Sequence, residues 1–483
     1  MKLSELSQIL DQPFTGADLS IENLAYDSRR VGAGTVFFAI KGEDHDGHRY
    51  VGAAIKSGAI AIVGEDAIYS EVPYFRVPNA KKALARISDA FYGRPSRKLH
   101  LGGVTGTNGK TTITYIIRHV FKELGLSSGI IGTNEWNVGR LLPATHTTPM
   151  SLELNQMLHD GHDLGVSHVV MEVSSHGIKE NRVDQLDFDR FIFTNITSEH
   201  MDYHPTFEDY LFTKMRPFIQ FGDYEADKVA IINYDDPAGP YVLSATNCRT
   251  LTYGLGELAD FSAREIALGL SETTFSLYVK GRFEGVVSYP LFGKYNIYNV
   301  LAVLAYFYSL GYSLQELISI LGKVPTVDGR AETLATATGF HVIIDYAHNP
   351  GAVKEVLSSL KQVTKGKIIT VIGAGGHRDK EKRKFMGAFA LEQSHHVVFT
   401  NDNPRDEDPM DIIRDLTSGT SLTNYDIVLD RAEAIERALL FAENGDYVAI
   451  LGKGHEKTQN INGKISPFSD KIVVEEVIRK RGI

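Results

Sequence analysis

A glycine-rich segment, Gly106-Thr-Asn-Gly-Lys-Thr-Thr112, most constrains the fold that this chain can adopt. The apolar run 99–105 before it predicts a strand. Behind it, apolar residues at helical spacing from Ile113 to Leu124 predict a helix of about four turns that stops at Gly125. A strand, a glycine loop and a helix in this order offer backbone N–H groups and a helix N-terminus to an anion. The segment therefore predicts a phosphate site within a strand–helix unit.

Two residues of this loop have the chemistry that a nucleotide needs. Lys110 would neutralise phosphate charge, and the Thr111 hydroxyl would hold Mg²⁺. The strict pattern of such loops requires a glycine five positions before Gly109, and Val104 stands there. A glycine-rich turn with an incidental lysine is the alternative, but the strand and helix in register favour the phosphate site. Its predicted residues are Gly106, Thr107, Asn108, Gly109, Lys110, Thr111 and Thr112.

Short β-branched runs alternate with amphipathic helical patterns along most of the 483 residues. Runs of this kind at 58–64, 166–172 and 368–373 are typical of α/β proteins with largely parallel sheets. The length suggests about three domains. Mixed Pro, Gly, Ser and charged residues indicate boundaries near 98 and 332. The predicted domains are therefore 1–98, 99–332 and 333–483.

The composition excludes several classes of protein. Hydrophobic residues make up 43% and charged residues 23%, so packed cores are expected and disorder is not. The formal net charge of −10 argues against a protein that coats nucleic acid or an anionic membrane. The single cysteine, Cys248, excludes an internal disulfide and is expected to be a small core residue. Acidic Glu5 and Asp11 near the start, and apolar runs too short for a bilayer, predict a soluble, cytoplasmic protein.

Polar side chains follow two further predicted strands. Glu172 ends one apolar run, and the run 191–197 leads into 198–204, which contains two histidines and an aspartate. In α/β proteins, side chains at the carboxyl ends of the strands commonly bind a Mg²⁺-nucleotide. Because a lone histidine is more often a core or surface residue, the residues alone leave a functional cluster and an ordinary structural role equally open.

A series of short motifs follows in order along essentially the whole chain. They are Gly106–Thr112, Thr147-Thr-Pro149, Glu172-Val-Ser-Ser-His176, Thr194-Asn-Ile-Thr197, His200-Met-Asp-Tyr-His204, Asn296-Ile-Tyr-Asn299, Gly329-Arg-Ala-Glu332, Asp345-Tyr-Ala-His348, Asp402-Asn-Pro-Arg405 and Gly452-Lys-Gly-His-Glu456. Several of them are weak individually, but in this order they are specific. On these motifs the chain resembles the Mur ligase family.

The resemblance implies a three-domain α/β architecture, with an N-terminal domain for the uridine end of a UDP-sugar, a central P-loop ATPase domain and a Rossmann-like C-terminal domain that brings an amino acid. The implied reaction consumes ATP with Mg²⁺, phosphorylates a carboxylate of UDP-N-acetylmuramoyl-L-alanyl-D-glutamate, and lets the amine attack the acyl phosphate. The amino acid would be the third of the peptidoglycan stem. No nucleic acid and no membrane insertion are expected, and the chain is expected to be a monomer.

The resemblance also assigns roles around ATP. Thr111 and Glu172 would bind one Mg²⁺ and His200 a second. Lys214 resembles the family lysine that CO₂ converts to N6-carboxylysine, whose anionic oxygens suit Mg²⁺, although on its own it would be read as a surface lysine. The implied catalytic residues are Lys110, His200 and Lys214. The implied ATP contacts outside the loop are Asn296 and Asn299 at the adenine, Arg330 at phosphate and Asp345 at the ribose.

For the UDP-sugar peptide, Ser28, Arg29 and the loop 42–48 resemble the uridine-side elements of the family. The segment Asp27-Ser-Arg-Arg could equally be a turn with a solvated charge pair. The central-domain residues that resemble contacts to the sugar peptide are Thr147, Thr148, Ser174 and Arg182.

The third amino acid is usually meso-2,6-diaminopimelate or lysine, which differ by one distal carboxylate. Arg405 resembles the diaminopimelate-type signature, because a guanidinium can grip that carboxylate and would lose its partner with lysine. Glu456 would pair with the distal ammonium, and a solvated Arg405 is the alternative. The implied amino-acid-binding residues are Arg378, Arg383, Asp402, Asn403, Arg405, Gly452 and Glu456.

Three positions depart from the family pattern. His377 stands where Asp is common, Gly177 where Ala is usual, and Met215-Arg-Pro follows the lysine in an unfamiliar way. A paralogue that joins lysine or another amino acid to a related carboxylate therefore stays open. A non-catalytic nucleotide-dependent binding protein is a remoter alternative, which the sets at His200, Lys214 and Asp345 disfavour.

Overall fold

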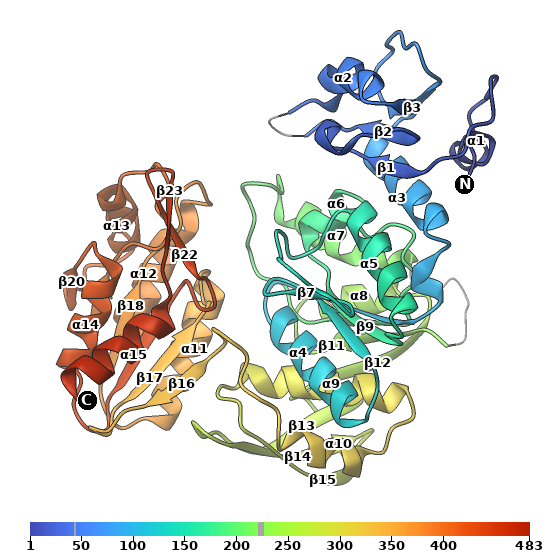
Figure 1. Ribbon diagram of the computed structural model, residues 1–483. Coiled ribbons are helices and arrows are strands. Elements are labelled where there is room, and N and C mark those ends of the chain that lie inside the picture. Colours follow the sequence, from blue (N-terminus) through green and yellow to red (C-terminus); the bar gives the residue numbers. More distant parts are fainter. Residues whose placement is uncertain (43–44, 221–226) are drawn as a thin grey trace.

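The computed structural model describes residues 1–42, 45–220 and 227–483. Three lobes follow one another along the chain, blue, then cyan to yellow, then orange to red, and each is built around its own β-sheet (Figure 1). Helices cover these sheets, which confirms the predicted α/β class. Within the described ranges, no helix combines the length and apolarity needed to cross a membrane.

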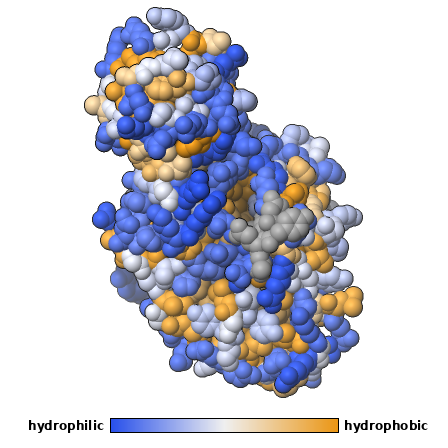
Figure 2. Space-filling model, turned by 90° about the vertical axis from the view of Figure 1, so that its right-hand side faces the viewer, coloured by the Kyte–Doolittle hydropathy of each residue, from blue (hydrophilic) through white to orange (hydrophobic). Residues whose placement is uncertain are grey.

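The N-terminal lobe contains a four-stranded parallel sheet in the order β1-β2-β3-β4. Its strands are β1 (Asn23–Ala25), β2 (Thr35–Ala39), β3 (Ala59–Gly64) and β4 (Tyr74–Arg76), and its helices are α1 (Leu3–Leu10), α2 (Val51–Lys56) and α3 (Ala80–Phe91). Leu152, from α5 (Ser151–Asp163) of the next lobe, joins the core of this one. The N-terminal lobe is thus seated on α5, and Figure 2 shows it standing out above the larger body, with hydrophilic residues prominent on this face.

The central lobe is built on an 11-stranded sheet in the order β15-β14-β13-β12-β11-β10-β5-β9-β6-β7-β8. It is parallel from β13 to β6 and antiparallel at both ends, so the expectation of largely parallel sheets is confirmed. The strands are β5 (His100–Thr105), β6 (Ser128–Ile131), β7 (Trp136–Asn137), β8 (Leu141–Leu142), β9 (His168–Glu172), β10 (Arg190–Phe193), β11 (Val229–Asn233), β12 (Arg249–Gly254), β13 (Phe261–Ala267), β14 (Thr273–Val279) and β15 (Arg282–Tyr289). The remaining helices are α4 (Lys110–Glu123), α6 (Ser175–Lys179), α7 (Phe207–Gln220), α8 (Gly239–Ala245), α9 (Tyr295–Ser309) and α10 (Leu314–Leu321).

The helix predicted behind the glycine loop is α4, which has 14 residues. Ile113, Ile116, Ile117 and Val120 on its apolar stripe are completely buried. This stripe anchors α4 to the sheet, and its N-terminus consequently lies at the carboxyl end of β5. Cys248, expected in a core, is only partly buried, at the edge of the hydrophobic cluster on the other side of the sheet.

The C-terminal lobe has a six-stranded sheet in the order β16-β17-β21-β18-β19-β20, parallel except for β16. Its strands are β16 (Glu332–Ala335), β17 (His341–Asp345), β18 (Ile368–Ile372), β19 (His396–Phe399), β20 (Tyr425–Ile427) and β21 (Tyr447–Leu451), with the hairpin β22 (Thr458–Ile461) and β23 (Lys464–Pro467). The helices are α11 (Pro350–Val363), α12 (Glu381–Gln393), α13 (Pro409–Thr417), α14 (Arg431–Phe441) and α15 (Asp470–Arg481). Strand β16 pairs Glu332 with Ile344, so this sheet begins one residue before the predicted boundary.

Candidate active site

The glycine loop is pressed against its neighbours so closely that two of its positions admit only glycine. Gly106 has φ +147°, and a Cβ there would lie 1.8 Å from Thr194 Oγ1. Gly109 has φ +90°, and its Cβ would lie 2.7 Å from Asn299 Oδ1. Because L side chains rarely adopt such backbone angles, the loop depends on both glycines. The strand, the loop and the helix thus meet as the sequence predicts, with the loop wedged between β10 and α9.

Two lysine side chains converge beneath the loop. Lys110 Nζ donates hydrogen bonds to the carbonyl oxygens of Gly106 and Thr107, each at 2.8 Å, and Lys214 Nζ donates to Gly106 at 2.8 Å. Lys214 lies on α7 and is only 1% exposed. Burial holds the pKa of Lys214 well below its ordinary value, and the charge of Lys110 lowers it further. A lysine that the sequence alone would place at the surface is therefore buried inside the site.

The Glu172 carboxylate lies at the end of β9 among oxygen-bearing side chains. It accepts hydrogen bonds from Thr111 Oγ1 at 3.0 Å, from Thr133 Oγ1 at 3.1 Å and from the Thr133 amide at 2.9 Å. Arg330 Nη2 donates to Thr111 Oγ1 at 3.0 Å and so brings a cation beside the same hydroxyl. A carboxylate and hydroxyls are the hard oxygen ligands that Mg²⁺ prefers, so this donor set fits the predicted ion.

A second group of side chains lies where β10 leads into α7. The ring of His176 stacks on Tyr203 at 4.0 Å and meets the ring of His200 edge-on at 4.8 Å. Burial lowers the pKa of His200 to about 3 and that of His176 to about 4. Both imidazoles are therefore neutral at physiological pH, which is the form that binds metal ions. The predicted histidine cluster thus forms one continuous group with His176.

Glu199, next to His200, links the central lobe to the C-terminal lobe. His348 Nε2 lies 3.2 Å from its Oε1, and Asn349 Nδ2 donates to the same oxygen at 3.4 Å. Burial opposes its ionisation, but the hydrogen bond and charge of His348 prevail and lower the pKa of Glu199. Asn349 also donates to Asn108 Oδ1 of the glycine loop at 3.1 Å. The two lobes therefore make direct polar contacts at the site.

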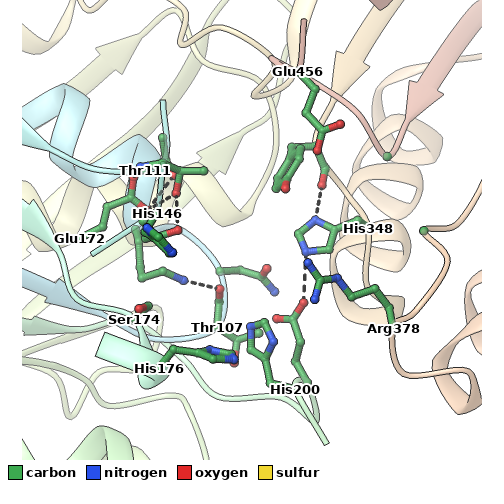
Figure 3. Close-up of a pocket in the computed structure, with 18 of the residues that line it drawn as sticks. Thr107, Thr111, His146, Glu172, Ser174, His176, His200, His348, Arg378 and Glu456 are labelled. Carbon is green, nitrogen blue, oxygen red and sulfur yellow. Dashed lines mark hydrogen bonds and ion pairs between the residues drawn. The ribbon is translucent and has the colours of Figure 1, made fainter. Parts of the chain in front are cut away.

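A cavity of 480 Å³ lies between these two lobes. Figure 3 shows Thr111, Glu172 and Ser174 on one side of it and His348, Arg378 and Glu456 on the other. It brings together these predicted residues: Thr107, Asn108, Gly109, Lys110, Thr111, Thr147, Thr148, Glu172, Ser174, Arg182, His200, Arg330, Arg378, Asp402, Asn403, Arg405, Gly452 and Glu456. Residues from three separately predicted groups thus share one cavity.

Other predicted residues lie behind the cavity wall. Asn299 Nδ2 donates to Asn296 Oδ1 at 2.7 Å, and Asn296 Nδ2 donates to the Phe292 carbonyl at 2.7 Å, which places this pair beside Gly109. Asp345 accepts from the amides of Ala331 and Ala347, each at 2.7 Å, and burial raises its pKa. The predicted residues outside the lining of this cavity are Ser28, Arg29, Gly106, Thr112, Lys214, Asn296, Asn299, Asp345 and Arg383.

On the C-terminal side, Glu456 already has partners. Lys453 Nζ, which is fully buried, donates to Glu456 Oε2 at 2.7 Å and to Asn403 Oδ1 at 3.1 Å, and Asn403 Nδ2 donates to Glu456 at 2.8 Å. Gly452 has φ +114°, and a Cβ there would lie 2.6 Å from Asp402 Oδ2. Hydrogen bonds and a close backbone approach therefore join the loops after β19 and β21, and they hold Glu456 at the cavity.

A larger cavity of 960 Å³ lies between the N-terminal and central lobes. Ser28, Arg29 and parts of the predicted uridine loop line it, whereas positions 43 and 44 of that loop lie outside the described residues. Arg29 is paired with Asp27 at 2.7 Å, as the alternative reading of this segment expected, and is also placed at the cavity. The residues shared by both cavities are His146, His176, Arg182, Asp202 and Arg378, so the two cavities adjoin.

Three ionisable groups in the N-terminal lobe, Asp46, His48 and Asp66, lie close enough together to suggest a metal site. However, His48 Nδ1 faces Asp46 Oδ1 at 2.6 Å, and its Nε2 accepts from the amides of Glu65 and Asp66 at 2.9 and 3.3 Å. Because both ring nitrogens are thereby engaged, this cluster is a hydrogen-bonded turn and not a metal centre.

Sequence reasoning left several cavity residues without a role. Glu199 and His348 belong to the predicted cluster and to one of the ordered motifs, but nothing in their spacing showed that they would pair across two lobes. Thr133 has no motif of its own. The cavity-lining residues that were not predicted are Thr133, His146, His176, Glu199, Asp202, Tyr346, His348, Gly375, Asp379 and Lys382.

Three family models match the chain in sequence: the Mur ligase middle domain at residues 104–307, the Mur ligase glutamate ligase domain at 329–454, and the Mur ligase family catalytic domain at 20–92. Together they cover the N-terminal lobe, the glycine-loop lobe and the lobe that carries Arg378 and Arg405. The order of the three matches agrees with the order of the three sheets.

Curated relatives match over nearly the full length. A UDP-N-acetylmuramoyl-L-alanyl-D-glutamate–2,6-diaminopimelate ligase from Halalkalibacterium halodurans is 41% identical over 463 residues, covering 95% of each chain. The protein of the same name from Geobacillus kaustophilus is 40% identical over 473 residues, covering 97% of this chain and 96% of the relative. A solved structure of a ligase with this name aligns with a TM-score of 0.70 and 29% identity, covering 99% of both chains.

Proposed function

Because the chain belongs to the Mur ligase family, we propose that it is an ATP-dependent ligase that joins meso-2,6-diaminopimelate to UDP-N-acetylmuramoyl-L-alanyl-D-glutamate in the synthesis of peptidoglycan precursors. The observation that carries this function is the 480 Å³ cavity, in which a phosphate loop and a carboxylate face two guanidinium groups from another lobe. Relatives named for this reaction match along nearly the whole chain, which supports the choice of substrates.

ATP would lie along the glycine loop. Lys110 and Arg330 would disperse phosphate charge, since both line the cavity beside the N-terminus of α4. Asn296 and Asn299 would hold the adenine behind Gly109, and Asp345 would hold the ribose. These three side chains lie outside the cavity lining, and Asn299 lies directly against Gly109 of the loop.

Mg²⁺ would be held by Thr111 and Glu172, with His200 at a second ion. The oxygen donors around Glu172 and the neutral imidazole of His200 suit these ions. When bound, Mg²⁺ neutralises charge on the transferring phosphoryl group. Burial lowers the pKa of Lys214 and so favours its uncharged amine, which is the form that reacts with CO₂. N6-carboxylysine at this position would add anionic oxygens near the ions.

The UDP-sugar peptide would lie in the 960 Å³ cavity, with its uridine end near Ser28 and Arg29. Arg182 lies at the junction of the two cavities and donates to the Thr148 carbonyl at 2.9 Å. The other central-lobe contacts to the sugar peptide would come from Thr147, Thr148 and Ser174. The acceptor carboxylate would thereby arrive at the junction, facing the end of the phosphate chain.

The amino acid would approach from the C-terminal lobe. Arg405 would grip its distal carboxylate and Arg378 its other one, while Glu456, Asn403, Asp402 and Gly452 shape the surroundings. The γ-phosphoryl group would move from ATP to the acceptor carboxylate, and the amine would then displace phosphate from the acyl phosphate. The chain mainly positions the three substrates and neutralises charge, which is the largest contribution that an enzyme makes to such transfers.

We further propose that domains 1–98, 99–332 and 333–483 carry the UDP-sugar, ATP and amino-acid sites, and that a monomer suffices. The three family matches, at residues 20–92, 104–307 and 329–454, support this division of the chain. The deciding experiment measures ADP release from purified protein given the UDP-muramoyl dipeptide and a panel of amino acids. ADP release that depends on diaminopimelate supports the proposal. Release with lysine but not diaminopimelate would replace the proposed amino acid, and no dependence on the dipeptide would refute the ligase.

A further inference from the structure

A buried guanidinium joins the two loops that carry Arg378 and Arg405. Arg383, on α12, is completely buried and donates from Nη2 to the Gly375 carbonyl at 3.0 Å. The same side chain forms two hydrogen bonds to the Glu407 carboxylate, at 2.9 and 3.1 Å. Gly375 follows β18 and Glu407 follows β19, which are neighbouring parallel strands. One side chain therefore ties the exits of both strands together.

Further contacts hold the two loops at close range. The Gly376 amide donates to the Asn403 carbonyl at 2.9 Å, and the guanidinium of Arg405 donates to the Gly376 carbonyl. A Cβ at Gly376 would lie 2.0 Å from the Pro404 carbonyl oxygen. Since no larger residue fits there, the separation of the loops is set by contact.

The residues that flank this contact have strained backbones. His377 has φ +49° and Arg405 has φ +56°, in the left-handed backbone region that residues other than glycine rarely adopt. The Arg405 amide donates to the Asn460 carbonyl at 3.1 Å, and the His377 amide donates to Glu407. Glu407 thus restrains one loop directly while it is itself fixed by Arg383. Such conformations persist only where surrounding contacts impose them.

The positive charge of Arg383 is paired with carboxylates of the protein itself. Glu407 and Asp415 both accept from its Nη1, each at 2.9 Å. The hydrogen bonds from Arg383 lower the pKa of Glu407 to about 2, so that carboxylate stays ionised. By contrast, Arg378 and Arg405 line the cavity, and Arg383 does not. Arg383 is therefore already neutralised by two carboxylates, whereas the two cavity arginines can meet the carboxylates of a ligand.

We propose that Arg383 is a positioning residue, which fixes the separation of Arg378 and Arg405 and thereby the preference for an amino acid that carries two carboxylates. Arg383 resembles an amino-acid ligand of the family in sequence, but here it acts through the two loops. The inference rests on the proposed function, because it presumes that the two cavity arginines bind the amino acid.

The test compares wild type with Arg383→Met, which keeps an unbranched apolar stem and removes the guanidinium donors, and with Arg383→Lys. We expect the KM for diaminopimelate to rise roughly tenfold to a hundredfold in Arg383→Met, because small displacements of binding groups are costly. The KM for ATP should stay within about twofold, since ATP binds to another lobe. Lys384→Met is the matched control, because Lys384 is partly exposed on the same helix and pairs with Glu381.

A double-mutant cycle with Arg405→Ala shows whether Arg383 acts through Arg405. If it does, the rise in KM for diaminopimelate in the double variant should be clearly smaller than the product of the two single rises, whereas independent losses would multiply and overturn the proposal. Arg383→Met with an unchanged KM for diaminopimelate would also overturn it, as would equal rises for ATP and diaminopimelate.

A milder variant covers the case in which Arg383→Met does not fold. Asp415→Asn removes one partner of Arg383 from a partly exposed position, with 42% of that side chain exposed, and should raise the KM for diaminopimelate a few-fold without changing that for ATP. An unchanged KM here counts against the proposal. If wild type instead uses another amino acid, the proposed function fails, and the same cycle with that amino acid tests the positioning role separately.

Discussion

Lys110 and Lys214 donate hydrogen bonds to the same atom, the carbonyl oxygen of Gly106, each at 2.8 Å. Two lysines that lie more than a hundred residues apart in sequence thus meet beneath the phosphate loop. Burial lowers the pKa of both lysines, and the charge of Lys110 lowers the pKa of Lys214 further. Bound anionic phosphates would favour the charged form of both lysines, and substitution of either lysine is a direct test of the site.

The first prediction concerns Lys110. Lys110→Ala should abolish turnover, with a loss of roughly a thousandfold or more, because it removes the cation that faces the transferring phosphoryl group. The measurement is ADP release, together with the thermal unfolding midpoint. Lys122→Ala, at the exposed end of the same helix, should behave as wild type. Turnover retained by Lys110→Ala with a normal unfolding midpoint would remove the phosphate-loop assignment.

The second prediction concerns Lys214. Lys214→Ala should be nearly inactive and should regain part of its turnover when short carboxylic acids are added, because such an acid can supply the oxygens of the missing carbamate. Turnover is measured with and without the acid, and wild type, which needs no rescue, is the control. Removal of CO₂ should lower wild-type activity reversibly. Normal turnover by Lys214→Ala would exclude the carbamate.

The third prediction concerns Glu172, the proposed metal ligand. Glu172→Gln keeps the size of the side chain but replaces the anionic carboxylate with a neutral amide. The Mg²⁺ concentration that gives half-maximal activity should therefore rise by roughly tenfold or more. The assay is a Mg²⁺ titration of ADP release at saturating ATP. An unchanged titration curve would show that Glu172 only orients Thr111 and Thr133.

The fourth prediction concerns Arg405. Arg405→Ala should weaken use of diaminopimelate by roughly tenfold to a hundredfold, since a charge-assisted pair is worth about 1.5–3 kcal/mol. Lysine lacks the distal carboxylate, so the use of lysine as a substrate should change far less. The preference for diaminopimelate over lysine should therefore become smaller. The measurement is kcat/KM for both amino acids in both proteins. An equal loss for the two would mean that Arg405 shapes the loop and does not contact the substrate.

The fifth prediction concerns the contact between the N-terminal and central lobes. Lys81 on α3 forms an ion pair with Glu180, which also accepts from Tyr203 Oη at 2.7 Å at the edge of the larger cavity. Lys81→Ala should raise the KM for the UDP-muramoyl dipeptide about three- to tenfold, because the N-terminal lobe, proposed to bind uridine, would lose part of its contact with the central lobe, while kcat changes little.

The adjacent Lys82→Ala is the control for this contact, because Lys82 is exposed on the same helix. Steady-state kinetics at saturating ATP and amino acid provide both constants. A fall in kcat with an unchanged KM would contradict the seating role and would instead connect Lys81 to the histidines beyond Tyr203.

Local patterns in the sequence were sufficient for the main elements. The glycine loop, its strand and α4 could be predicted because spacing within about twenty residues decides them, and the ordered motifs were sufficient for the family. The same patterns placed Glu172 at the end of a strand, where the structure has it. These elements are determined by residues that lie close together in the sequence.

Contacts between distant segments were decided only by tertiary structure. The pairing of Glu199 with His348 joins two lobes, and Lys214 is buried because α7 packs against the loop after β5. Arg383 resembled a substrate ligand in sequence, yet its Nη1 and Nη2 already donate to Glu407 and its Nη1 also donates to Asp415. A sequence shows which side chains are able to form ion pairs and hydrogen bonds. Which partner each one takes depends on how sheets and helices pack, because burial makes an unpaired charge costly and selects one arrangement.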